Sequence, residues 1–340
     1  KTFKASLLTE PEEIENKSGL PFKEFTPFWK HCLKKLNAST PLPAPQKVEP
    51  PKVSLKTTEL SELNLKPMQD WGHSMNEVWT PGERGATSAL ELFVNDSFNE
   101  YAQNRNFPNT KGTSRLSPHL RFGEISPRQI KHTLEQSGHA NWKGSHYLSE
   151  IGWREFGYHL LYHFPHTVRE PLRPQFNRFP WKENSPQLRS WQKGQTGYPL
   201  VDAGMRELWA TGWMHNRVRM VVASFLVKHL LIHWRHGADW FWDTLVDADL
   251  ASNTQGWQWT AGSGADAAPY FRIFNPTTQA MKFDPKGDYI RKWVPELRHM
   301  SAQDIFEPSK VDGGQNYPNP IVNHSEARDR ALKAYEKTKA

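Results

Sequence analysis

The feature that most constrains the fold is a succession of segments with helical periodicity, which begins near Pro81 and continues toward the carboxyl terminus. Apolar residues recur every three to four positions, the spacing that places them on one face of an α-helix. Alternating runs of β-branched residues, typical of half-buried strands, are scarce. The pattern therefore predicts an all-α fold, with helices expected at 82–105, 145–164, 198–213, 215–237, 238–250 and 325–339.

The first 75 residues lack this periodicity. Residues 41–52, "PLPAPQKVEPPK", cannot form a helix because proline lacks the backbone donor, and they are typical of an extended segment. We expect residues 1–75 to be a connector and residues 76–340 to be one helical domain. The sequence starts with lysine and shows no signal peptide, so we expect a fragment or a processed product.

Composition indicates the kind of partner. Fifteen tryptophans favour stacking on flat ligands, and a net charge of +7 favours a polyanion such as nucleic acid. Core packing and ordinary solubility charge are the alternatives. The single cysteine, Cys32, fits a reducing compartment, so we expect a cytoplasmic protein. No membrane span is expected, because the apolar run 220–234 is interrupted by Lys228, His229 and His233.

The first candidate site is the run 111–127, "KGTSRLSPHLRFGEISP". Small hydroxyl side chains and backbone amides occur there where a helix could begin, and such a turn can bind phosphate through its N–H groups. Arg115 strengthens this interpretation. Ordinary helix capping is the alternative.

A second candidate lies in the segment 145–164. Glu150, Trp153 and Arg154 have the i, i+3, i+4 spacing that places them on one helix face. A carboxylate, a large ring and a guanidinium together suit hydrogen bonding and stacking on a base. An amphipathic helix with one core tryptophan and a surface ion pair explains them equally well.

The third candidate is "GWMHNRVRM". Asn216, Arg219 and Met220 share a face, and Arg217 points about a quarter turn away. Asparagine can read a base edge, arginine can hold a phosphate, and methionine can pack against a flat ligand. Core packing is the alternative for Met220.

The fourth candidate is "LVDADLASNTQGW". Asp247 and Asp249 are two positions apart and cannot share a helix face, so a chain that wraps a ligand fits better than a plain helix. A solvated helix end is the alternative. No metal site is expected, and the pair His229 and His233 is typical of a helix surface.

Taken in order, these segments resemble the FAD-binding catalytic domain of the photolyase/cryptochrome family, and most of all the class I cyclobutane pyrimidine dimer photolyases. The resemblance runs from Tyr101 to the end and is carried by "GTSRLSPHL", "WREF", "TGYPLVDAGMREL", "TGWMHNRVRM", "SFLVKHLLIHWR", "DADLASNTQGWQW", "DAAPYFRIFNPTTQ" and "KFDPKGDYIRKWVPEL". It implies that residues 1–75 end a connector, and that most of the α/β domain for an antenna pigment, a folate or a deazaflavin, is missing.

The resemblance also implies a buried FAD. Arg219 and Asp247 would form an ion pair beside the flavin ring, and the Asn253 amide would face flavin N5. The cofactor-binding set implied in this way is Tyr101, Thr113, Ser114, Arg115, Leu116, Ser117, Tyr147, Glu150, Arg154, Asn216, Arg219, Asp247, Ala248, Asp249 and Asn253.

The implied activity is light-driven repair of a flipped-out pyrimidine dimer in DNA, through an electron donated by excited reduced FAD. Trp257, Trp234 and Trp181 match the family's electron-transfer chain. Glu150 and Asn253 are the other catalytic residues implied. The implied substrate and DNA contacts are Arg105, Glu150, Trp153, Asn216, Arg217, Met220, Trp259 and Gln279.

Two alternatives stay open at this point. A (6-4) photolyase would carry two histidines in the segment where this chain has Asn216 and Met220. A cryptochrome, which signals through protein partners, often differs at the position of Asn253. We expect a monomer that binds damaged DNA.

Overall fold

The computed structural model describes residues 4–36, 40–65, 70–267, 269–270, 272–312, 314 and 316–339. These residues form helices and connecting segments and contain no β-strand, which confirms the all-α class. The α-helices are α1 Phe25–Lys34, α2 Glu83–Asp96, α3 Tyr101–Asn104, α4 Ser117–Phe122, α5 Pro127–Gln136, α6 His146–His163, α7 Ser185–Gln192, α8 Pro199–Thr211, α9 Asn216–Ser224, α10 Trp234–Thr244, α11 Leu250–Ala261, α12 Pro276–Phe283, α13 Asp288–Trp293 and α14 His324–Glu336.

Shorter helical turns connect these elements. The 3-10 turns are η1 Pro11–Glu13, η2 Leu60–Leu63, η3 His73–Glu77, η4 Trp142–Gly144, η5 Pro165–Val168, η6 Pro174–Arg178, η8 Pro295–Leu297, η9 Asp304–Phe306 and η10 Pro308–Lys310, while η7 Phe225–His229 is a π-helical turn.

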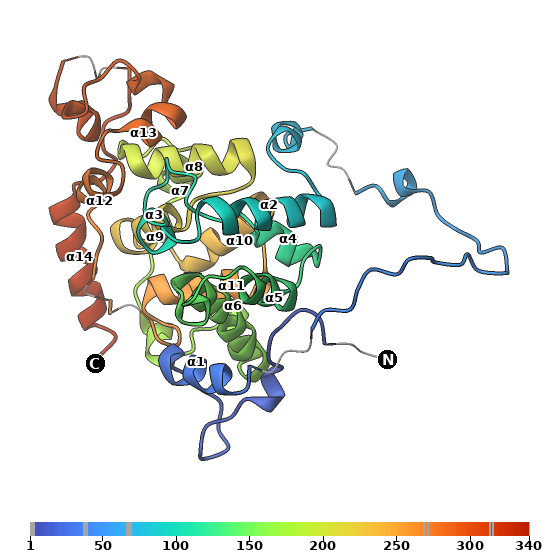
Figure 1. Cartoon of the computed structure of the whole chain (residues 1–340). Coiled ribbons are helices and arrows are strands. Elements are labelled where there is room, and N and C mark those ends of the chain that lie inside the picture. The colour runs from blue at the N-terminus through green and yellow to red at the C-terminus, as the bar shows by residue number, and fades with distance from the viewer. Residues whose placement is uncertain are drawn as a thin grey trace.

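Two apolar clusters form most of the core. One joins α8, α9, η7, α10, α11 and α13 around Trp191, Trp234 and Trp257. The other joins α1, α2 and α6 around Phe28 and Phe156. Helix α11 packs against both α6 and α10, so it lies where the two clusters meet. The residues of the fourth candidate are therefore held at the centre of the body (Figure 1).

The amino-terminal segment has a packed part and an exposed part. Helix α1 buries Phe25, Phe28, Trp29 and Cys32 and packs against α6, because these four residues repeat at helical spacing on one face. Residues 40–65 have no buried side chain, and Figure 1 shows this segment extending away from the helical body. The expected extended connector is thus found in residues 40–65, while α1 belongs to the packed body.

The prediction of one continuous helix over 215–237 is wrong. The segment is divided into α9, η7 and α10, with Leu231 at φ 55°, in the left-handed region that interrupts a helix. The His233 side chain accepts a hydrogen bond from the Arg235 backbone N–H and so caps α10. His229 is fully buried and hydrogen-bonded to His324 at 2.9 Å, contrary to the expected helix surface. Because nearly every side chain here is buried, periodicity alone could not locate the break.

Candidate active site

The centre of the site is an ion pair between α9 and the chain that joins α10 to α11. Arg219 donates from Nη2 to Asp247 Oδ2 at 2.8 Å and from Nε to the Met214 carbonyl at 2.6 Å. Asp247 is buried, and its Oδ1 has no hydrogen-bond partner among the described residues. A buried acceptor without a donor costs about 1–3 kcal/mol. The pair therefore fits a ligand that donates an N–H or O–H group.

Asp249 and Asn253 lie at the start of α11. Asp249 uses both carboxylate oxygens within the protein: Oδ1 accepts from the Ser252 backbone N–H at 2.7 Å and Oδ2 from the Tyr158 hydroxyl at 2.5 Å. Asn253 donates from Nδ2 to the Ala238 carbonyl at 2.9 Å, and its amide oxygen accepts no hydrogen bond from a described residue. Asp249 therefore shapes the site, while Asn253 keeps an acceptor for a ligand.

The turn 113–117 leads into α4, which begins at Ser117, and no side chain caps this helix at its start. The Leu116 backbone N–H donates to Ser114 Oγ at 3.4 Å, and Ser117 Oγ accepts from Trp213 Nε1 at 3.4 Å. Arg115 has φ 53°, and its guanidinium lies 4.6 Å from the centre of the Trp213 ring. Thr113 is half-buried. Trp213, which follows α8, thus connects this turn to the segment that carries Arg219.

A second ion pair joins α6 to the residue after α3. Arg105 Nη2 lies 2.8 Å from Glu150 Oε1, and both side chains stay partly accessible. Burial raises the pKa of Glu150, and the Arg105 charge opposes that rise. The Arg105 guanidinium also lies 5.4 Å from the centre of the Tyr101 ring. The sequence placed Arg105 and Glu150 in one site, and the structure brings them together.

Tyr101 and Tyr147 form a buried wall beside this pair. Their rings meet edge to face with centres 5.2 Å apart. Burial raises the pKa of both phenols, so both stay neutral. The Tyr147 hydroxyl has no partner at hydrogen-bonding geometry among the described residues.

Arg217 lies on α9 next to the second pair. Its Nη2 donates to Asn106 Oδ1 at 2.5 Å, and its guanidinium lies 4.5 Å from the centre of the Phe283 ring. Its Nη1 approaches Met220 Sδ at 3.8 Å. Asn216, the first residue of α9, is exposed. This end of α9 therefore carries a cation, an amide and a thioether that are accessible to a partner.

The other predicted residues are more scattered. Trp153 stacks on Phe25 of α1 with ring centres 3.8 Å apart, a contact that the sequence did not predict. Arg154 donates to the Ser6 carbonyl at 2.7 Å, so its guanidinium contacts the amino-terminal segment. Ala248, Trp259 and Gln279 are half-buried.

The three tryptophans of the expected electron-transfer chain differ in depth. Trp257 and Trp234 are each 2 % exposed, and Trp181 is half-buried. A Cβ on Gly237, one turn after Trp234, would lie 2.0 Å from the Trp257 ring, so this glycine lets the ring pack against α10. Trp181 contacts His233, whose ring also lies beside Trp234.

The structure also shows stacked tryptophans that the sequence did not pair. Trp209 stacks on Trp240 and on Trp71, with ring centres 5.9 Å and 5.4 Å apart. Trp79 lies over Arg115 at 4.7 Å. Only the excess of tryptophan hinted at such contacts, because the partners come from segments far apart in the sequence.

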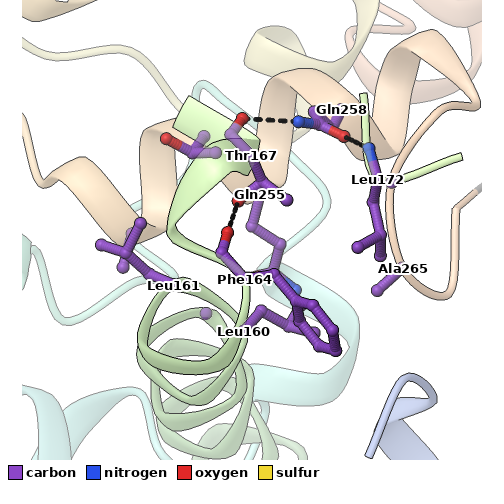
Figure 2. Close-up of a pocket in the computed structure, with 12 residues that line it drawn as sticks. Leu160, Leu161, Phe164, Thr167, Leu172, Gln255, Gln258 and Ala265 are labelled. Atoms are coloured by element: carbon purple, nitrogen blue, oxygen red, sulfur yellow. Dashed lines mark hydrogen bonds between the residues drawn. The ribbon is translucent and has the colours of Figure 1, made fainter. Parts of the chain in front are cut away.

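A separate cavity lies between α6, η5 and α11 (Figure 2). Its volume of about 20 Å³ is enough for roughly one water molecule. The Gln258 side chain donates to the Thr167 and Glu170 carbonyls and accepts from the Leu172 N–H. The cavity is therefore a packing space beside a satisfied amide and is too small for a cofactor.

The described residues can be searched for metal sites and for membrane-spanning helices. Within the described ranges, no three His, Cys, Asp or Glu side chains gather closely enough to hold a metal ion. Across the part of the chain that the structure describes, each helix is too short or too polar to cross a bilayer.

The fold and the site define an all-helical protein in which a buried aspartate and an asparagine each keep an oxygen without a donor among the described residues. Residues 147–337 match the family pattern described as the FAD binding domain of DNA photolyase, and residues 1–46 match the DNA photolyase pattern. The chain belongs to the DNA photolyase family. FAD is its cofactor, and the unfilled oxygens of Asp247 and Asn253 fit the N–H and O–H groups of a flavin.

Individual relatives agree with this assignment. The chain is 47% identical to the deoxyribodipyrimidine photo-lyase of Agrobacterium fabrum, covering 100% of this chain and 74% of that protein. It is 43% identical to the enzyme of that name from Escherichia coli, covering 98% and 72%. A crystal structure of a bacterial class III photolyase from Agrobacterium tumefaciens superposes with a TM-score of 0.95 at 46% identity, covering 99% and 73%.

The family, the cofactor and the enzyme class are those expected from the sequence. The chain is a lyase of the photolyase type that repairs cyclobutane pyrimidine dimers in DNA. Because the solved relative is described as class III, the class I subgroup stays a prediction.

Proposed function

We propose that FAD binds between α6, α9 and α11, and that a pyrimidine dimer enters past the Arg105–Glu150 pair. The observation that carries this proposal is the buried Asp247 carboxylate, which pairs with Arg219 through one oxygen and leaves the other without a donor. When bound, FAD supplies the light-excited electron for repair. The protein binds, orients and encloses it.

On the flavin side, the Arg219–Asp247 pair orients the ring and Asn253 offers a neutral amide to it. A neutral amide tolerates negative charge on a reduced flavin better than a carboxylate would. Other residues contribute side chains or backbone amides to the remaining walls of the pocket. The wall residues are Tyr101, Thr113, Ser114, Arg115, Leu116, Ser117, Tyr147, Glu150, Arg154, Asn216, Ala248 and Asp249.

On the substrate side, Glu150 hydrogen-bonds the dimer, while Trp153 and Trp259 stack on it. Asn216 and Met220 contact the same bases. Two observations support these roles. Asn216 is exposed at the start of α9, where the charge of Arg217 also acts on Glu150. Trp259 has no ring contact with a described aromatic residue. Arg105, Arg217 and Gln279 hold the DNA backbone, so its binding should weaken with salt.

Trp257, Trp234 and Trp181 form a relay that reduces oxidised FAD from the protein surface. Trp257 and Trp234 are both buried and Trp181 is half-buried, and this exposure of the last member supports the role. Trp257→Phe should slow light-driven reduction of oxidised FAD while repair by pre-reduced enzyme stays nearly intact. Collapse of repair in the pre-reduced variant would contradict the relay.

The domain division and the cellular setting complete the proposal. Residues 1–75 would be the connector and residues 76–340 the catalytic domain, although α1 packs with the latter. The buried, unpaired Cys32 supports a reducing, cytoplasmic setting. We propose a monomer, which sedimentation at several concentrations would test.

The decisive experiment is repair of a single-stranded oligonucleotide that carries one thymine cyclobutane dimer. The flavin is reduced beforehand, and samples are kept in blue light or in darkness. Light-dependent return of intact thymines is the expected result. Bound FAD and bound oligonucleotide without repair would contradict the proposal and indicate a cryptochrome-like receptor.

A further inference from the structure

The inference concerns a strap, residues 71–79, that is attached to the end of α8. Ser74 Oγ donates to the Ala210 carbonyl and Trp79 Nε1 to the Thr211 carbonyl, each at 2.7 Å. The last carbonyls of a helix have no partner within the helix. Both bonds satisfy such groups, and the second fixes the position of the Trp79 indole.

Trp79 and Trp213 hold the Arg115 side chain between them. The guanidinium carbon lies 4.7 Å from the centre of the Trp79 ring and 4.6 Å from that of the Trp213 ring. A cation over an indole face is attracted by the ring's quadrupole. Arg115 makes no hydrogen bond or ion pair with a described residue. The two rings are therefore its direct side-chain contacts, and the charge of the Glu207 carboxylate also acts on it.

The same contacts lead to the flavin side of the site. The Arg219 guanidinium carbon lies 5.9 Å from the centre of the Trp213 ring, and Arg219 pairs with Asp247 at 2.8 Å. Rings and cations thus alternate in the order Trp79, Arg115, Trp213, Arg219. This row connects the strap with the ion pair proposed to orient FAD.

Several properties of Arg115 are typical of a side chain that binds an anion. Its backbone has φ 53°, a conformation that persists in a residue with a side chain only when the surroundings hold it. The turn 113–117 around it offers hydroxyl groups and amides. FAD carries a diphosphate, which a planar guanidinium can bind with two parallel hydrogen bonds.

We propose that Trp79 is a positioning residue for the cofactor, because it clamps Arg115 against Trp213 and so aims an unpaired guanidinium at the diphosphate of FAD. This inference rests on the proposed function, in which residues 113–117 line the FAD pocket, and it adds that the diphosphate of FAD binds at this turn. Trp79 acts through Arg115 and does not itself touch FAD.

The test measures FAD affinity of the whole chain after its flavin has been removed. Trp79→Ala should weaken binding about tenfold, or about 1.4 kcal/mol. Trp79→Phe keeps a ring over Arg115 but loses the bond to Thr211, so it should retain most of the affinity. The control is Trp242→Ala, which removes an indole that is 43% exposed and lies outside the clamp, and it should leave affinity unchanged.

A double-mutant cycle distinguishes a clamp from a merely structural residue. Arg115→Met should also weaken binding about tenfold, and Trp79→Ala should add little in that background, because coupled residues are not additive. If Trp79→Ala weakens FAD binding by the same factor with Arg115 present and with Arg115→Met, the clamp is contradicted. Lower thermal stability of Trp79→Ala with unchanged FAD affinity would overturn it as well.

The cycle also separates this inference from the one on which it rests. If Arg115→Met leaves FAD affinity unchanged, the diphosphate does not bind at this turn, and both fail. If Arg115→Met weakens FAD binding but Trp79→Ala does not, the placement of the diphosphate stands and the clamp alone fails.

Discussion

Two buried aspartates, one in the scaffold and one in the site, differ in how many of their oxygens accept hydrogen bonds. Asp202 in α8 accepts four hydrogen bonds: from the Thr196 backbone N–H at 2.7 Å, the Thr196 hydroxyl at 2.6 Å, the Gly197 N–H at 3.1 Å and the Tyr317 hydroxyl. Asp247 has one ion pair and one oxygen without a donor.

The difference separates a structural carboxylate from one that keeps capacity for a ligand. Burial raises the pKa of Asp202, and its four donors oppose that rise, so the group is stabilised where it stands. It ties α8 to a segment 115 residues later in the chain. Asp247 leaves part of its desolvation cost uncompensated, which the family's cofactor can offset.

The largest expected effect is the loss of stability in Asp202→Ala. Four donors would lose their acceptor in a buried site, so the free energy of unfolding should fall by roughly 4 kcal/mol. Urea denaturation of flavin-free protein measures this fall, and Asp247→Ala is the matched control. An equal fall in the free energy of unfolding in the two variants would contradict the distinction between the two aspartates.

Glu155 sharpens the comparison, because it is a scaffold carboxylate with one oxygen unfilled. Its Oε2 accepts from the Leu8 and Thr9 N–H groups, while Oε1 accepts no hydrogen bond and lies 3.9 Å from Arg154 Nη1. Burial raises the pKa of Glu155 to about 7. Since the folded pKa lies above the unfolded one, the folded state binds the proton more tightly. Stability should therefore fall as the pH rises from about 4.5 to about 7.

The expected fall is roughly 3 kcal/mol, from a shift of about 2.5 pKa units. Unfolding free energies of the unaltered chain and of Glu155→Gln, measured by urea at pH 5 and pH 8, give the result. The glutamine variant should lose most of this pH dependence. The same slope in both proteins would show that another group carries the titration.

Asp247→Ala should weaken FAD binding about 100-fold, or about 2.8 kcal/mol, with little change in the stability of the flavin-free protein. Arg219 keeps its bond to the Met214 carbonyl, so the guanidinium stays in place without its acid. Titration of flavin-free protein with FAD measures the affinity. Unchanged affinity would contradict the role given to Asp247.

The smallest effect is expected at the accessible pair. Glu150→Ala should lower repair of a dimer about tenfold, about 1.4 kcal/mol, without loss of FAD, since the Arg105–Glu150 pair lies outside the buried ion pair. Repair rates at equal flavin content give the measurement. A variant that loses its yellow colour on purification would assign Glu150 to the flavin instead.

Much of the site follows from local spacing. The i, i+3, i+4 rule placed Glu150, Trp153 and Arg154 on one face of a helix, and that helix is α6. Glu150 pairs with Arg105, however, while Trp153 and Arg154 contact the amino-terminal segment. The two-residue separation of Asp247 and Asp249 favoured a chain that wraps a ligand over a plain helix, and the chain does leave the helix between α10 and α11. The helix expected over 238–250 is therefore wrong after Thr244. Spacing within one segment sets these arrangements, so the sequence determines them.

Other features depend on segments far apart, and only the tertiary structure decided them. The sequence by itself determined an all-α chain, the faces of its helices and the family motifs, since backbone geometry converts local spacing into helix faces. The fold decided the break at Leu231, the stacking of Trp153 on Phe25 and the clamp around Arg115. Such contacts depend on which helices pack together, and periodicity within one segment carries no information about its partner.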